Sequence, residues 1–245
     1  MKIYSVLQIG EYHINHCEDY LFVGEIGNGK TLCAVMDGCT TAIDSHLIST
    51  LVGKLLRKIV KEKGYKDLYN PEAIDNLDSY LKSILKDLFK ELNIIKGQLM
   101  LERNELLTTL ILLLVDKSKN EGIILAIGDG LVSINGEITE FEQDNKPDYL
   151  GFHLAEDFEN WYSIQTQKII FHNIHDIGIA TDGIYMFKPF KKTETTDYIN
   201  PIEFLLSDKT NSENEDMLNL KLKKLEHNFG LKPTDDIAII RLIKD

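Results

Sequence analysis

Acidic residues stand at the ends of several apolar runs in this 245-residue chain. Some of these runs end in an Asp-Gly pair, and others begin with two acidic residues. The pairs are Asp37-Gly38, Asp129-Gly130, Asp182-Gly183, Glu18-Asp19 and Asp235-Asp236. If the apolar runs are strands, their carboxylates can meet at one edge of a sheet. Hard divalent cations prefer such oxygen ligands, so the pattern predicts a metal-dependent hydrolase.

Each Asp-Gly pair has a simpler explanation, because Asp-Gly is a common turn dipeptide. Glycine accepts a positive φ, and Asp hydrogen-bonds to the backbone near it. Any single pair could therefore do no more than end a strand. The whole set is harder to explain in this way, since crowded carboxylates repel one another unless a cation lies between them.

The composition argues against a nucleic-acid partner, a disulfide framework and a membrane-spanning segment. The chain has 39 acidic and 27 basic residues and a net charge of −12, so we expect no nucleic-acid partner. Cys17, Cys33 and Cys39 have no Cys-x-x-Cys spacing, which favours a reducing compartment over a disulfide framework. Residues 1–5 do not begin a signal peptide, and the longest apolar run, 106–115, is too short to span a membrane. We expect a cytoplasmic monomer with no membrane partner.

Short apolar runs bounded by turn residues predict strands in both halves of the chain. They are expected at 3–9, 20–26, 31–36, 106–115, 122–127, 131–134, 137–141, 162–171, 176–181 and 237–243. The four strands within 106–141 are predicted to form one meander, with Asn135-Gly136 as a hairpin turn.

Two long amphipathic helices are predicted between the first strands and this meander. The first is expected to begin at Asp44 or Ser45. Its buried residues, which recur every four positions, are Leu47, Leu51, Leu55 and Ile59. The second is expected to begin with Asn70 as its cap and Pro71 in its first turn.

The end of the chain completes the pattern with further helices. A short helix is expected at 201–206, and a longer one is expected to begin at Ser212 or Asn214. The order of strands, two helices, strands, helix and strand indicates an antiparallel, layered α+β fold. We expect one domain that covers residues 1–245.

Residues 24–31 match the phosphate-loop pattern GxxxxGK[ST]. In that motif a helix follows the Lys-Thr pair, so that its N-terminus faces the phosphates. Here only five apolar residues separate Thr31 from Asp37-Gly38, and Glu25 would lie among the phosphates. We therefore interpret the segment as a hairpin turn, and nucleotide hydrolysis through Lys30 is the last of our alternatives.

The order of the acidic motifs resembles the metal-dependent Ser/Thr protein phosphatases of the 2C type, in their bacterial branch. A Glu-Asp pair precedes a strand, and Val-Met-Asp-Gly follows ahead of two long helices. A strand with Thr108-Thr109, a Gly-Asp strand end, a Thr-Asp-Gly and a late Asp-Asp-Ile-Ala-Ile-Ile come next. The resemblance spans nearly the whole chain. It implies two packed antiparallel β-sheets flanked by helix pairs.

The resemblance also implies hydrolysis of phosphoserine or phosphothreonine in phosphorylated protein substrates. A water or hydroxide that bridges two cations, Mn²⁺ or Mg²⁺, would attack the phosphorus in line. Asp37 would bridge both cations, and a third would bind more weakly. The Gly38 carbonyl would be a further ligand. The remaining implied ligands are Asp182 and Asp235 at the first cation, Glu18 with its hydrogen-bonding neighbour Asp19 at the second, and Asp129 at the third. Asp236 replaces the usual Asn and is a weaker candidate than Asp235.

Two departures from the family pattern affect the expected chemistry. The family usually continues Asp-Gly with His-Ala-Gly or Met-Gly-Gly, but this chain has Cys39-Thr40-Thr41, which leaves the source of the leaving-group proton open. Many members carry an arginine shortly before the Glu-Asp pair, and this chain has none there. His13 or His16 could bind the substrate phosphate instead, because a cationic imidazole can do so.

Two further departures concern the third cation and the substrate. Met186 replaces an acid often found soon after the third Asp-Gly pair, and the flap expected at 142–161 is short. The departures leave two functions open. One is an active phosphatase, and the other is a weak or inactive regulatory module on the same fold.

Overall fold

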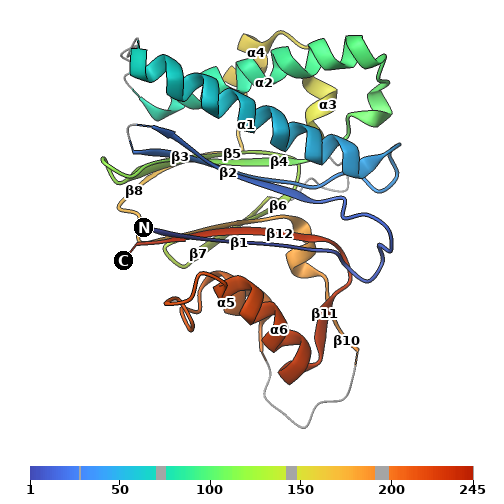
Figure 1. Ribbon diagram of the computed structural model, residues 1–245, viewed down its shortest axis with the longest axis vertical. Helices are drawn as coiled ribbons and strands as arrows, with labels where there is room; N and C mark the ends of the chain where they lie inside the picture. The colour runs from blue at the N-terminus through green and yellow to red at the C-terminus, as the bar shows by residue number, and fades with distance from the viewer. Residues whose placement is uncertain (28, 70–75, 142–147, 191–198, 245) are drawn as a thin grey trace.

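Two five-stranded antiparallel sheets form the centre of the protein (Figure 1). They are seen in a computed structural model that describes residues 1–27, 29–69, 76–141, 148–190 and 199–244. The first sheet has the strand order β1-β12-β9-β6-β7 and the second β2-β3-β4-β5-β8. Helices cover the outer face of each sheet. The predicted fold of two packed sheets flanked by helix pairs is confirmed.

The strands of the two sheets come from alternating parts of the chain. The first sheet contains β1 (Lys2–Gln8), β6 (Gly130–Ile134), β7 (Glu137–Phe141), β9 (Asp176–Ala180) and β12 (Ile237–Ile243). The second contains β2 (Tyr20–Gly27), β3 (Lys30–Met36), β4 (Leu110–Asp116), β5 (Glu121–Ile127) and β8 (Lys168–His172). A separate short pair consists of β10 (Phe187–Pro189) and β11 (Leu231–Pro233).

Two long helices pack on the second sheet, and two shorter ones pack on the first (Figure 1). The long helices are α1 (Ser45–Tyr69) and α2 (Leu77–Leu99), and the shorter ones are α5 (Pro201–Leu206) and α6 (Met217–Phe229). Single turns form α3 (Leu150–His153) and α4 (Phe158–Ser163). None of the helices in the described part of the chain is long and apolar enough to cross a membrane.

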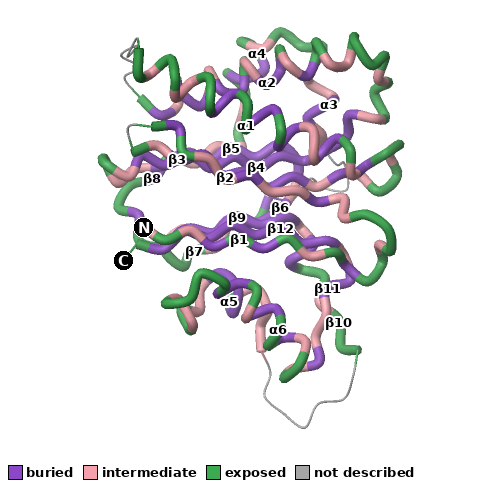
Figure 2. Tube along the Cα trace, viewed as in Figure 1, coloured by how far each residue is buried: buried purple, intermediate pink, exposed green. Residues whose placement is uncertain are grey.

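Both faces of the central strands are buried, as Figure 2 shows. In β3, Leu32 and Ala34 pack toward α1 and α2, while Cys33 and Val35 pack between the sheets. Alternate side chains of a strand point to opposite faces, so a strand that is buried on both faces reads as a continuous apolar run. This double burial explains why the strands of the second sheet lack the alternation of a half-exposed sheet.

Residues 106–141 do not form the predicted meander. β4 and β5 lie in the second sheet, whereas β6 and β7 lie in the first. The chain changes sheets at Gly128 and Gly130, which have φ values of 92° and 138°, a region open mainly to glycine. The strand predicted at 162–171 begins only at Lys168, because Tyr162 belongs to α4.

The predicted helices are present, although α6 begins at Met217 and not at Ser212 or Asn214. In α1 the buried face contains Ile48 and Val52, and Leu47 is 41% exposed. The prediction was therefore wrong for Leu47 and missed Ile48, whereas Val52, which we expected to widen the stripe, and Leu55 and Ile59 are buried as expected. The caps predicted at 70–71 lie outside the described residues.

Residues 24–27 lie in β2 and residues 30–31 lie in β3, and the two strands pair Glu25 with Thr31 and Gly27 with Lys30. Strand β3 continues directly from Lys30, so no helix N-terminus is available for a phosphate. The side chain of Lys30 lies 3.9 Å from Asp116. The hairpin interpretation is confirmed.

Candidate metal centre

The register of the second sheet brings two acidic motifs together. Strands β2 and β3 pair Tyr20 with Met36, so Asp19, just before β2, lies across from Asp37, just after β3. The Gly38 amide donates a hydrogen bond to the carbonyl of Glu18, at 3.2 Å. Antiparallel pairing thus places the start of one strand and the end of the next at the same edge of the sheet.

The first sheet contributes its acidic motifs at the same edge. Strand β9 ends at Ala180, which pairs with Leu131 of β6 and Ile239 of β12. Asp182 follows β9, while Asp129 and Asp235 precede β6 and β12. The Thr181 hydroxyl donates a 2.6 Å hydrogen bond to Asp19, which connects the two sheets.

The glycines after Asp37 and Asp182 allow backbone segments to approach very closely. A Cβ at Gly38 would lie 2.2 Å from the carbonyl oxygen of Ser45, and one at Gly183 would lie 1.8 Å from that of Asp236. Neither Gly38 nor Gly183 has a positive φ. These two Asp-Gly pairs therefore use glycine for close packing rather than for the backbone freedom of a turn.

Two threonine hydroxyl groups in the segment just before β4 hold the backbone of Asp37. The Thr108 hydroxyl donates to the Asp37 carbonyl at 2.8 Å, and the Thr109 hydroxyl accepts from the Asp37 amide at 3.1 Å. Thr108 and Thr109 thus do more than favour a strand. They fix the end of β3 from which the Asp37 carboxyl projects.

The carboxylates are close enough to change one another's protonation. Burial is the main cause of the raised pKa of Asp37 and of Asp19, and neighbouring carboxylates raise them further. Burial, Asp129 and Asp235 together raise the pKa of Asp182 to about 6. Such mutual repulsion is what a bound cation would relieve.

The donor set fits a hard divalent cation. Ser45 donates to Oε1 of Glu18 at 2.6 Å, while Oε2 is buried without a hydrogen-bond partner. A buried carboxylate oxygen that accepts no hydrogen bond is suited to a cation. In the described part of the chain, no group of three His, Cys, Asp or Glu side chains is arranged to hold a metal as it stands, so binding would require carboxylate side chains to turn.

The adjacent acids Asp235 and Asp236 occupy different environments. The carboxylate of Asp236 is buried and accepts hydrogen bonds from the backbone amides of Gly10, at 2.7 Å, and Glu18. The side chain of Asp235 is 34% exposed and acts electrostatically on Asp37 and Asp182. This difference supports Asp235 as the ligand and gives Asp236 a structural role.

The structure places the two candidate histidines differently. His13 lies among the carboxylates, with Nδ1 2.9 Å from Asp236 and Nε2 3.6 Å from Glu18. Nδ1 is not aligned for a hydrogen bond, so the contact is an ion pair when the ring is protonated. His16 is exposed and stacks on His46, with 4.1 Å between ring centroids.

The chain's arginines make other contacts. Arg241 is fully buried and pairs with Asp176 through two hydrogen bonds of 2.9 and 2.7 Å. Arg103 lies over the ring of Phe152, 4.4 Å from its centroid, and Arg57 is exposed on α1. Within the described contacts, no arginine pairs with a carboxylate of the metal edge.

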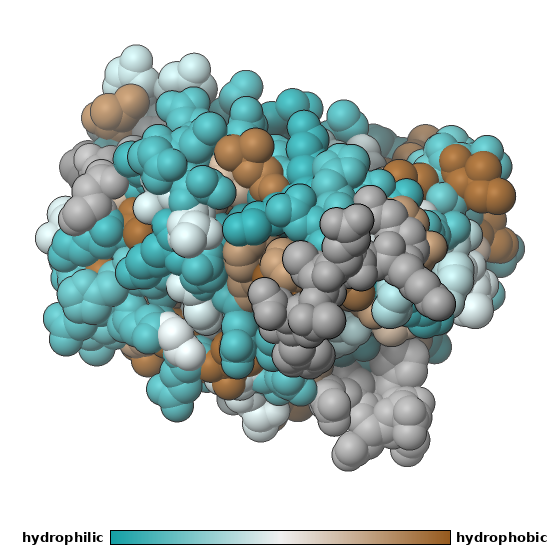
Figure 3. Space-filling model, turned by 90° about the horizontal axis from the view of Figure 1, so that it is seen from below, coloured by the Kyte–Doolittle hydropathy of each residue, from teal (hydrophilic) through white to brown (hydrophobic). Residues whose placement is uncertain are grey.

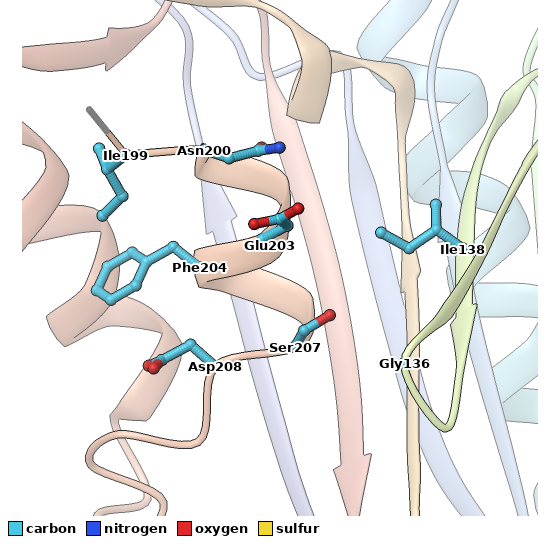
Figure 4. A pocket seen from close by; sticks show the side chains of 8 residues that line it. All are labelled: Gly136, Ile138, Ile199, Asn200, Glu203, Phe204, Ser207 and Asp208. Atoms are coloured by element: carbon cyan, nitrogen blue, oxygen red, sulfur yellow. The ribbon is translucent and has the colours of Figure 1, made fainter.

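A cavity of roughly 640 Å³ lies away from these carboxylates. It is formed by α5 and the β6–β7 hairpin, including Glu203, Phe204 and Gly136 (Figure 4). Asp129 precedes β6, whereas Gly136 lies beyond the other end of that strand, so the cavity and the acidic edge are separate. The face seen from below is mostly hydrophilic, with apolar side chains in small groups (Figure 3).

Some residues of this edge were missed by sequence reasoning. Ser45 and Thr181 were not singled out as partners of carboxylates, because a lone hydroxyl residue has no distinctive spacing. Tyr149 also lies near this edge, since the amide of its neighbour Leu150 donates a hydrogen bond to the carbonyl of Thr108, at 2.9 Å. Its place depends on a contact between distant segments, which periodicity does not reveal.

Comparisons with solved structures identify the fold. Several solved phosphatase structures share the fold. A bacterial serine phosphatase has a TM-score of 0.62 and 15% identity, over 100% of this chain and 98% of that one. Stp1 from Staphylococcus aureus, a serine/threonine phosphatase, has a TM-score of 0.61 and 15% identity, over 100% and 96%. RsbX in complex with magnesium has a TM-score of 0.54 and 14% identity, over 98% and 94%.

Sequence comparison gives the family directly. A search of curated proteins gave no significant match. The family model for protein phosphatase 2C, in contrast, matches residues 9–225, a range that includes each acidic motif except Asp235-Asp236. The chain belongs to the protein phosphatase 2C family, the metal-dependent protein-serine/threonine phosphatases that its acidic motifs predicted.

Proposed function

We propose that this protein removes phosphate from phosphoserine or phosphothreonine in protein substrates, using two divalent cations, Mg²⁺ or Mn²⁺. The observation that carries the proposal is the convergence of Asp37, Asp182 and Asp235, whose charges act on one another at one edge of the two sheets. We propose further that residues 1–245 act as a single domain.

The positions of the side chains support the ligand roles that we propose. Asp19 of the second sheet and Asp182 and Asp235 of the first all act electrostatically on Asp37, which suits a residue that contacts both cations. Asp182 and Asp235 would hold one cation, and Glu18 and the Gly38 carbonyl the other. When bound, two close cations neutralise phosphoryl charge and make a shared water more acidic. Asp129 raises the pKa of Asp182, which supports a weaker third site beside it.

The surrounding residues position these ligands. Thr108 and Thr109 hold the Asp37 backbone, and Ser45 orients the Glu18 carboxylate. Protonated His13 would add a positive charge beside Glu18. Hydrogen bonds of this kind around metal ligands commonly affect affinity or activity by about 10- to 100-fold.

The test of the proposal is phosphate release from a phosphoserine peptide with Mn²⁺, with Mg²⁺ and with a chelator. We expect phosphate release with at least one of the two cations and no release with the chelator. No release under any condition would contradict the proposal.

A regulatory module with weak or no turnover is the second candidate. Two observations favour it, namely the Cys39-Thr40-Thr41 sequence after Asp37-Gly38 and the engagement of Arg241 in a buried pair with Asp176. This candidate predicts that the phosphoserine peptide binds with a measurable affinity but is not hydrolysed. Calorimetry with the peptide, alongside the release assay, separates the two candidates.

A further inference from the structure

The ring of His13 lies between acidic residues from opposite ends of the chain. Its Nδ1 atom is 2.9 Å from Asp236 and 3.8 Å from Asp235. Its Nε2 atom is 3.6 Å from Oε2 of Glu18. The side chains of His13 and Glu18 are only 15% and 13% exposed. The ring therefore lies within the acidic edge, between the motif before β2 and the motif before β12.

Backbone contacts hold the segment that carries His13 against the start of β12. The amides of residues 11 and 12 donate hydrogen bonds to the carbonyls of residues 233 and 234, at 3.2 and 2.9 Å. The His13 amide closes a turn by donating to the carbonyl of Gly10, at 3.2 Å. A Cβ at Gly10 would lie 2.2 Å from the carbonyl carbon of Asp235. The fold itself thus brings His13 to the acidic edge.

The two nitrogens of the ring face different carboxylates. Asp236 accepts hydrogen bonds from the amides of Gly10 and Glu18, so its carboxylate is fixed beside Nδ1 of His13. These two groups are within hydrogen-bond distance, and a rotation of the ring would align them. Among the described residues, Nδ1 of His13 and Oε2 of Glu18 are buried polar atoms without a hydrogen-bond partner. Each can therefore gain a partner without the loss of another.

Nε2 of His13 and Oε2 of Glu18 have a separation that one cation can bridge. Two donors that each lie about 2.1 Å from a small divalent cation can be up to about 4.2 Å apart. These two atoms are 3.6 Å apart, too far for a good hydrogen bond to each other. A histidine that binds a metal commonly donates its other ring N–H to a carboxylate, which fixes the ring. Asp236 stands where this carboxylate is needed.

We propose that Nε2 of His13 is a ligand of the cation beside Glu18, that Asp236 holds the other nitrogen of the ring, and that this site therefore prefers Mn²⁺ to Mg²⁺. The inference rests on the proposed function, which requires the cations. Binding uses the lone pair of Nε2 and leaves the proton on Nδ1. A ring that carries two protons in the metal-free protein releases one of them to the solvent.

The preference for Mn²⁺ follows from the nitrogen donor. Mg²⁺ binds oxygen ligands and keeps several of its waters, so it gains little from an imidazole. Imidazole suits the transition metals, whose ions bind nitrogen more readily. The cation held by Asp182 and Asp235 would have oxygen donors from both side chains, so we expect no such preference there.

Calorimetry of the metal-free protein tests the inference without a substrate. We expect one site of the wild type to bind Mn²⁺ at least about tenfold more tightly than Mg²⁺. His13→Gln should weaken Mn²⁺ binding about 10- to 100-fold and Mg²⁺ binding less than about threefold, and Asp236→Asn should weaken Mn²⁺ binding about tenfold. His172→Gln is the matched control, because this histidine of β8 is 65% exposed, and it should change neither affinity.

Pulsed EPR of the Mn²⁺-loaded protein gives a second readout, because it detects a nitrogen bonded to the ion. We expect a nitrogen signal from the wild type and from His172→Gln, and none from His13→Gln. A wild type without the nitrogen signal would overturn the inference, and so would a signal that persists in His13→Gln. Equal losses of Mn²⁺ and Mg²⁺ affinity in His13→Gln would also overturn it, since they would give the ring a structural role.

The phosphate-release assay distinguishes a failure of this inference from a failure of the proposed function. Phosphate release by a wild type without the nitrogen signal would overturn the role of His13 and leave the phosphatase intact. A nitrogen signal without phosphate release would support the role of His13 and contradict the phosphatase. A protein that binds neither Mn²⁺ nor Mg²⁺ would overturn both.

Discussion

Thr181 and Asp19 join the two sheets through a buried hydrogen bond of 2.6 Å between the hydroxyl and the carboxylate. Thr181 follows β9 in the first sheet, and Asp19 precedes β2 in the second. The Thr181 oxygen also accepts a 2.9 Å hydrogen bond from the amide of Ala238. One side chain thus aligns the ends of β9, β12 and β2, from which the acidic residues project.

Replacement of Thr181 by valine should lower stability, because valine has a similar shape but no hydroxyl. The Ala238 amide and the Asp19 carboxylate would each lose a buried partner, at a cost of about 1–3 kcal/mol. Chemical denaturation of the metal-free protein measures this loss. Thr166→Val, at an exposed position, should be close to neutral, and equal effects of the two substitutions would contradict the assigned role of Thr181.

The pKa of Asp182 is raised to about 6. This shift predicts that the free energy of unfolding of the metal-free protein decreases as the pH rises. A carboxyl whose pKa is higher in the folded state favours folding while it is protonated, and this contribution is lost as the pH rises through the folded pKa. In chelator at pH 7.5, Asp182→Asn should therefore be more stable than the wild type. The difference should shrink as the pH falls and vanish toward pH 3, below the ordinary pKa of 3.8, where the carboxyl is protonated in both states.

Thermal unfolding of both proteins across this pH range measures the difference directly. Addition of Mg²⁺ or Mn²⁺ at pH 7.5 should reverse the order, since a cation stabilises the wild type and removes the repulsion. A variant that is less stable than the wild type in chelator at pH 7.5 would contradict this account of the crowded carboxylates.

Replacement of Gly183 by alanine should distort the acidic edge. The new Cβ would meet the carbonyl of Asp236 at 1.8 Å, and relief of an overlap of this kind typically costs about 1–3 kcal/mol or more. Activity should fall as well, because Asp182 precedes this glycine. Gly97→Ala is the matched control, since its Cβ would meet nothing within 4 Å in α2 and alanine favours a helix.

His13 and His16 should differ in their effect on activity. His13→Gln removes the ring that lies between Glu18 and Asp236, so we expect a loss of about tenfold, as for other residues that orient metal ligands. His16→Gln removes only an exposed ring that stacks on His46 and should change the rate by less than about twofold. Steady-state kinetics on one substrate compare the two, and the reverse order would assign the phosphate-binding role to His16.

Much of the fold could be predicted because its signals are local. The apolar run of β3 and the start of α1 at Ser45 are features of neighbouring residues. The division of 106–141 between two sheets was not predictable, because it depends on which distant strand each one pairs with. The apolar residues around Tyr162 are equally compatible with a strand, and only packing against Phe158 and Trp161 shows that they form a helix.

The candidate site was predictable to a similar degree. Acidic pairs at strand ends identified the ligands, because strand ends are visible in the sequence. The partners that orient them were not visible, since Ser45 reaches Glu18 over 27 positions and Thr181 reaches Asp19 over 162. A single hydroxyl residue carries no periodic signal, so only the folded chain shows what it contacts.

The most direct test of the central claim is metal-dependent hydrolysis of p-nitrophenyl phosphate by the wild type and by Asp37→Asn. Asp87→Asn, a carboxylate on α2 that pairs with Lys63, is the matched control. We predict that Asp37→Asn lowers kcat at least about 100-fold, or about 3 kcal/mol, while Asp87→Asn keeps the wild-type rate. Wild-type activity that survives in Asp37→Asn would contradict the claim that Asp37 holds the catalytic cations.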